Sequence, residues 1–64
     1  MPIATINILE GRDDAKKEKL IVEVTDAIAR AIDVPKDNIH ILINEMSPQN
    51  YGQAGVSTKK KRGG

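Results

Sequence analysis

The fold is decided by the stretch Ile39-His40-Ile41-Leu42-Ile43-Asn44-Glu45-Met46. Its β-branched residues favour an extended strand. Its first half is apolar at consecutive positions, so both faces of that strand carry apolar side chains. Strands of this kind are typical of parallel sheets that are covered on both faces. The stretch therefore predicts a strand that pairs in parallel with another.

The partner strand lies near the start of the chain, at residues 3–9, which are again rich in β-branched residues and end at Glu10-Gly11, a turn signal. Residues 13–32 predict a helix, because Asp13 stands at a favoured cap position and Pro35 prevents continuation. The apolar residues follow the i, i+3, i+4, i+7 rule: Leu20, Ile21, Val24, Ala27, Ile28, Ala31 and Ile32. We expect the charged residues of this helix to face water: Lys16, Lys17, Lys19, Glu23, Asp26 and Arg30.

Together these elements predict an α/β fold, a βαβ subunit with two parallel strands and one crossover helix. Residues 47–50 predict a turn, and residues 51–56 a short hairpin or arm. We assign residues 1–58 to the βαβ domain and residues 59–64 to a basic flexible tail. Lys59-Lys60-Lys61-Arg62 has the composition of a nucleic-acid patch. No aromatic stacking platform accompanies it, so we expect a solvated tail and no nucleic-acid partner.

The size of the chain creates a stability problem. The chain has 64 residues, no cysteine, one histidine and 2% aromatic residues. A core this small is marginal, disulfides are excluded, and an ordinary histidine-based zinc site is not supported. One helix covers one face of a two-stranded sheet and leaves the other face in water. Self-association, with two chains pairing into a four-stranded sheet, removes this difficulty.

Charge and hydropathy narrow the function further. The net charge is +1, which does not suggest a binder of polyanions. No apolar run approaches the length of a membrane span, and the first residues lack the pattern of a signal peptide. We expect a cytoplasmic protein with no membrane partner.

Pro2 is the first candidate for chemistry. If Met1 is removed, Pro2 carries a free secondary amine, and α-amino groups have a pKa of roughly 7.7–8.0 in model peptides. Desolvation and neighbouring cations lower the pKa of an amine, and a base works best when its pKa is close to the operating pH. Arg12 is a cation that would lower the pKa of the Pro2 amine if the two residues lie close together. The plainer alternatives are that Pro2 merely starts a strand and that Arg12 is an exposed turn residue.

Four segments together resemble the 4-oxalocrotonate tautomerase family: Pro2-Ile3-Ala4, Ile8-Leu9-Glu10-Gly11-Arg12, Glu45-Met46 and Tyr51-Gly52-Gln53-Ala54-Gly55. The resemblance covers nearly the whole chain in order and spacing, apart from about the last six residues. It implies a homohexamer built as a trimer of dimers, with active sites shared between subunits. It also implies an isomerase that needs no cofactor or metal and moves a proton on an enol or unsaturated 2-oxo acid.

The same resemblance implies roles for individual residues. Pro2 corresponds to the general base, and Arg12 to the arginine that holds a substrate carboxylate. Tyr51 corresponds to a position that is usually phenylalanine and forms an apolar wall beside the proline; ordinary interface packing is the alternative. His40 departs from the pattern, because well-studied members carry a second arginine there. As a neutral donor His40 would still reach the carbonyl oxygen of a substrate, or it is simply structural.

Two other functions remain open at this level. The same proline serves hydratases, dehalogenases and decarboxylases in the superfamily that the chain resembles. A non-catalytic, self-assembling binding module is the third hypothesis. The natural substrate and its pathway are not encoded in any recognisable motif.

Overall fold

Two parallel strands form the centre of the computed structural model, which describes residues 1–63. Strand β1 (Ile3–Leu9) pairs with β2 (His40–Met46). The register runs without a break from Ile3 opposite His40 to Leu9 opposite Met46. The predicted βαβ order and the parallel pairing are confirmed, and η1 (Lys36–Asn38) leads into the second strand.

Helix α1 (Asp14–Ile32) begins and ends close to the predicted residues. The Asp13 side chain accepts a hydrogen bond from the backbone amide of Lys16 at 2.9 Å, which satisfies one of the free amides of the first turn. At the other end Asp33 adopts a left-handed conformation with φ 55°. Pro35 follows in extended geometry, so the chain turns away from the helix and enters β2.

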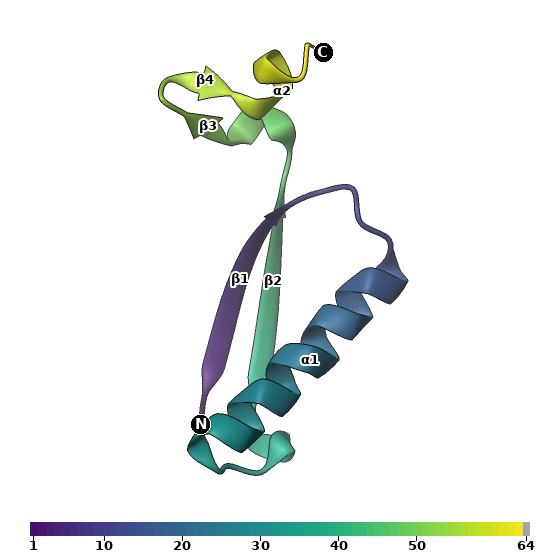
Figure 1. Ribbon diagram of the computed structural model, residues 1–64, viewed down its shortest axis with the longest axis vertical. Helices are drawn as coiled ribbons and strands as arrows, with labels where there is room; N and C mark the ends of the chain where they lie inside the picture. Colours follow the sequence, from purple (N-terminus) through teal and green to yellow (C-terminus); the bar gives the residue numbers. More distant parts are fainter. Residues whose placement is uncertain (64) are drawn as a thin grey trace.

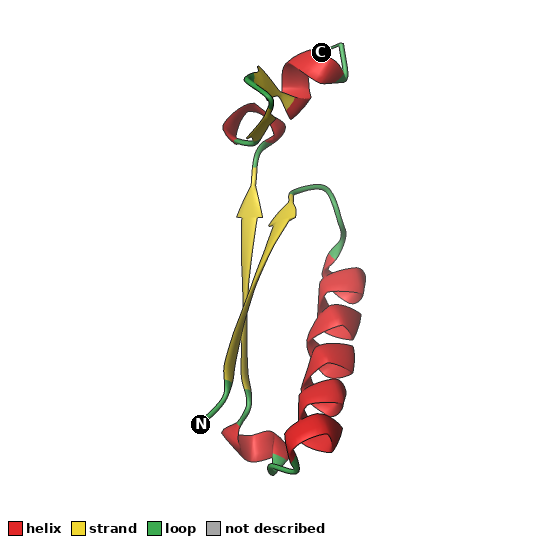
Figure 2. Ribbon diagram, turned by 60° about the vertical axis from the view of Figure 1, so that its left-hand side comes forward, coloured by secondary structure: helices red, strands yellow, loops and turns green. Residues whose placement is uncertain are grey.

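The helix covers one face of the strand pair only, as the two views show (Figures 1 and 2). Side chains on that face are half-buried, and they alternate with exposed ones along both strands. On the opposite face Ile3 is 66% and Leu42 54% exposed. We call this opposite face, which carries Ile3, Thr5, Asn7, His40, Leu42 and Asn44, the open face.

No side chain of residues 1–63 is fully buried within the single chain. The open face carries the apolar side chains of Ile3 and Leu42 among polar ones, and the Asn44 side-chain amide donates to the Asn7 side-chain oxygen at 3.2 Å. Burying apolar surface contributes roughly 25 cal/mol per Å², so covering Ile3 and Leu42 against another chain would stabilise the fold.

Beyond β2 the chain forms an arm that lies past the end of the sheet (Figure 1). The arm consists of η2 (Pro48–Asn50), β3 (Gly52–Gln53), β4 (Val56–Ser57) and α2 (Thr58–Lys61). Ala54 and Gly55, with φ of 56° and 82°, make the tight turn between β3 and β4, and two positive φ values suit a hairpin of this hand.

The arm continues further than the sequence analysis expected. Residues 59–61, which we assigned to a flexible tail, belong to helix α2. The Ser57 hydroxyl accepts from the Lys60 amide at 3.1 Å, and the Thr58 amide donates to the Tyr51 carbonyl at 2.8 Å. These contacts tie the start of α2 to the hairpin. Residue 64, the last of the predicted tail, lies outside the described residues.

Two ion pairs link helix α1 to neighbouring segments of the chain. Because of them, Lys17 and Asp26 do not face water as the sequence analysis expected. Lys17 Nζ lies 3.1 Å from Glu45 Oε1 on β2, and Lys36 Nζ lies 2.9 Å from Asp26 Oδ1. The hydrogen bond to Glu45 raises the pKa of Lys17 above its usual value. The hydrogen bond from Lys36 lowers the pKa of Asp26 below its usual value. None of the helices in residues 1–63 has the length and apolar character that crossing a bilayer requires.

Candidate active site

Pro2 and His40 lie side by side at the end of the sheet where both strands begin. The His40 amide donates to the Pro2 carbonyl oxygen at 3.0 Å. Pro2 is half-buried, whereas Met1, which precedes it, is 79% exposed. We call this the proline end of the sheet. Removal of the exposed Met1 would turn the Pro2 nitrogen from an amide into an amine.

Arg12 and Tyr51 lie past the opposite end, where both strands finish. Gly11, at φ 128°, turns the chain out of β1, a conformation that favours glycine. Arg12 Nη1 then donates to the Leu9 carbonyl oxygen at 3.1 Å, which holds the guanidinium near the end of β1. Tyr51 follows η2 in the arm and is 42% exposed. We call this the arginine end of the sheet.

The two pairs of candidate residues are therefore far apart within one chain. Each strand has seven residues, and strand residues rise about 3.3 Å each, so the ends are separated by about 20 Å. Parallel pairing enforces this separation, because both strands begin at one end and finish at the other. A single chain brings Pro2 together with His40 but brings neither of them to Arg12.

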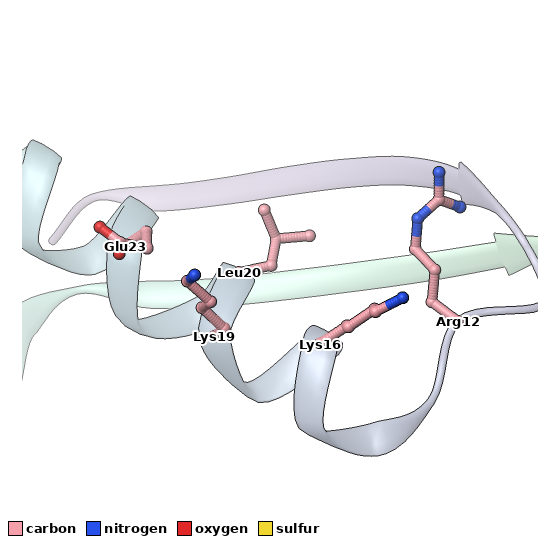
Figure 3. Close-up of a pocket in the computed structure, with 5 residues that line it drawn as sticks. All are labelled: Arg12, Lys16, Lys19, Leu20 and Glu23. Carbon is pink, nitrogen blue, oxygen red and sulfur yellow. The ribbon is translucent and has the colours of Figure 1, made fainter.

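A groove beside α1 extends from Arg12 along the first three turns of the helix. Its volume is about 320 Å³, and it is lined by Arg12, Lys16, Lys19, Leu20 and Glu23. Figure 3 shows Lys16 extending toward Arg12 and Leu20 pointing toward the strands. Sequence reasoning missed this groove. The sequence gives a partial signal, because Lys16 and Lys19 are three residues apart and share one helix face. The position of Arg12, which precedes the helix, depends instead on the turn at Gly11.

The groove is cationic because its positive side chains have no acidic partners. None of Arg12, Lys16 and Lys19 forms an ion pair within residues 1–63. Two acids close in the sequence have other contacts: Asp13 caps the helix and Asp14 lies 3.5 Å from Lys17 Nζ. No set of three His, Cys, Asp or Glu side chains in the described part of the chain is arranged to hold a metal ion.

Taken together, these features define a class of small βαβ subunit that has a proline opening its first strand and an arginine following it. The family assignment is direct. The family model for tautomerase enzymes matches residues 2–61, and this chain belongs to that family. It is an isomerase with tautomerase activity, since relatives named 2-hydroxymuconate tautomerase and 4-oxalocrotonate tautomerase match it along nearly its whole length.

Individual relatives are similar in both sequence and structure. The 2-hydroxymuconate tautomerase of Pseudomonas putida is 47% identical over 62 residues, covering 97% of this chain and 98% of the relative. A 4-oxalocrotonate tautomerase isozyme of Methylibium petroleiphilum is 34% identical with a TM-score of 0.94 and covers 97% of both chains. A heterohexameric 4-oxalocrotonate tautomerase of Chloroflexus aurantiacus is 32% identical with a TM-score of 0.90, covering 94% of this chain and 97% of that one.

Proposed function

We propose that this chain catalyses the tautomerisation of an enol or unsaturated 2-oxo acid, with Pro2 as general base and Arg12 holding the substrate carboxylate. The Pro2 amine takes a proton from the enol hydroxyl or from an acidic carbon. It returns a proton to another carbon of the conjugated system as the electron pairs shift along it. The substrate and product are isomers, so the reaction consumes no co-reactant and needs no cofactor.

The observation that carries this proposal is the position of Pro2. It opens β1 in a half-buried setting beside His40, and further desolvation in an assembled site would disfavour the charged form of its amine. The relatives from Pseudomonas putida and Stutzerimonas stutzeri, at 47% and 49% identity, are named for action on 2-hydroxymuconate. An enol of this kind is therefore the first substrate to assay.

The separation of the two ends of the sheet supports a site shared between chains. If two copies pair through a sheet edge in opposite directions, the proline end of one copy lies beside the arginine end of the other. The pair then makes a four-stranded sheet. We propose that three such dimers cover their open faces against one another in a homohexamer, and a heterohexamer among the structural neighbours is consistent with this size.

The remaining residues have supporting roles in this site. The planar fork of Arg12 suits two-point binding of a carboxylate. Tyr51 supplies an apolar wall that excludes water from the amine, and its hydroxyl requires a polar partner when it is covered. His40 donates to the carbonyl oxygen of the substrate, on which negative charge develops. It stabilises that charge less than a permanent cation does.

Replacement of the base is the decisive experiment. Pro2→Ala should lower the rate on 2-hydroxymuconate by roughly 10²–10⁴-fold, the usual contribution of a general base, while the oligomer persists. Pro35→Ala, at an exposed proline outside the site, is the matched control. Intact mass must first establish that Met1 is absent. Equal rates for the two variants would eliminate Pro2 as the base.

A further inference from the structure

The groove beside α1 has the volume and composition of a ligand site. Its volume of about 320 Å³ falls at the lower end of the range for small-molecule pockets, roughly 300–1,000 Å³. Leu20 forms an apolar floor, and the aliphatic stems of Lys16 and Lys19 form the sides. Lysine stems commonly cover apolar surface in this way while their ammonium groups reach water.

Charge gives the groove its selectivity. Three cations and one acid, Glu23, line it, which leaves a formal excess of two positive charges. Of the other lysines, Lys17 and Lys36 each have a carboxylate within 3.5 Å, whereas Lys59, Lys60 and Lys61 form no ion pair within residues 1–63. Lys16 and Lys19 have no such partner among the described residues, although acidic residues are plentiful nearby in the sequence.

Arg12 connects the groove to the proposed reaction. One of its N–H groups donates to the Leu9 carbonyl oxygen, and a guanidinium has five such donors. The other donors have no hydrogen-bond partner among residues 1–63, so a ligand can bind them. A carboxylate bound by Arg12 therefore lies at one end of the groove, and a second anionic group on the same molecule reaches the ammonium groups beyond it.

We propose that Lys16 and Lys19 are specificity-determining residues that bind, next to Arg12, a second anionic group of the substrate carried on a short apolar stem. This inference rests on the proposed function, since it takes Arg12 as the carboxylate holder. It adds a substrate class: acids that carry, at the end remote from the reacting carbonyl, a second anionic group a few carbons away from the first. We expect an acid with both anionic groups to bind this groove more tightly than an acid with one carboxylate does.

The test compares two probes that differ by one carboxylate, glutarate and butyrate, on the full assembled protein. Calorimetry should find that glutarate binds the wild-type protein at least tenfold more tightly than butyrate. In Lys16→Gln/Lys19→Gln this preference should fall to less than threefold. Lys59→Gln/Lys60→Gln removes the same charge elsewhere on the chain and should keep the preference. Circular dichroism checks that each variant retains its helix.

Inhibition kinetics complete the experiment. Glutarate should compete with 2-hydroxymuconate, and its inhibition constant should rise about tenfold in Lys16→Gln/Lys19→Gln but not in the control. Equal binding of both probes, an equal effect in the control variant, or binding without competition would each overturn the proposal. Because calorimetry measures binding without turnover, the result stands apart from the test of Pro2 as a base.

Discussion

The backbone amide of His40 donates a 3.0 Å hydrogen bond to the carbonyl oxygen of Pro2, so the two strands begin in step with each other. This contact fixes the histidine beside the proposed base without any side-chain interaction. A substitution of the His40 side chain therefore leaves the position of Pro2 intact, which makes the residue a clean probe of charge at the proline end.

His40→Arg should raise kcat/KM on 2-hydroxymuconate by about tenfold, because a permanent cation stabilises the developing oxyanion better than a neutral donor does. His40→Gln keeps a neutral donor and should stay within about threefold of the wild type. Steady-state kinetics on the two variants measures the difference. A rate that is the same for arginine and glutamine would place His40 outside the site.

A site shared between chains predicts that two inactive variants complement each other. Pro2→Ala and Arg12→Ala chains, unfolded together and reassembled in equal amounts, should recover about a quarter of wild-type activity. This figure follows because one half of the prolines and one half of the arginines combine at random in a symmetric assembly. The measurement is the rate of the mixture against each variant reassembled alone. A mixture as inactive as its components would mean that each site uses one chain.

If the open face is covered in the assembled protein, a charge introduced at its centre should disrupt assembly strongly. Leu42→Asp should abolish assembly and, with it, the folded state, because burial of a leucine contributes about 1.5–3 kcal/mol per copy and the introduced carboxylate has no partner. Leu42→Ile preserves the apolar surface and should assemble. Sedimentation measures assembly, and circular dichroism measures the folded fraction of each variant. A folded, monomeric Leu42→Asp protein would show that the face needs no cover.

The Asp26–Lys36 pair predicts a specific dependence of stability on pH. The folded protein holds the pKa of Asp26 below its usual value of 3.8, so the pair contributes stability above that pH. The contribution is lost as the pH falls through the folded-state pKa. Asp26→Asn should therefore lower the Tm at pH 6, and the difference from the wild type should vanish in stronger acid. Asp37→Asn, at an exposed aspartate outside the ion pairs described above, should show no such pattern.

Local signals in the sequence were sufficient for the framework of the fold. The cap at Asp13 and the stop at Pro35 bound α1, and the apolar run of β2 indicates parallel pairing, because these effects act between neighbours in the chain. The short hairpin or arm expected at residues 51–56 is present as β3 and β4, but its turn places Ala54 at a positive φ that alanine rarely adopts by itself.

Features that depend on contacts between distant segments were not predictable in this way. Lys17 lies against Glu45 because the helix crosses the sheet at a particular angle, which no periodicity reveals. Helix α2 forms where Thr58 meets Tyr51, a contact created by the hairpin between them. The groove depends on how the turn at Gly11 places Arg12, whose guanidinium is held at the end of β1. The roles of Pro2, Arg12, His40 and Tyr51 came from the family resemblance and remain predictions.

None of the side chains of residues 1–63 is fully buried in a lone copy, so in the proposed assembly the stability of the fold depends on protein concentration. When structure forms only through contacts between copies, the folded fraction depends on the product of chain concentrations, and the melting temperature falls on dilution. Specific activity would then decline in nanomolar assays for reasons unrelated to the chemistry. In a cell, newly made chains would remain exposed to proteases until enough copies had accumulated to associate.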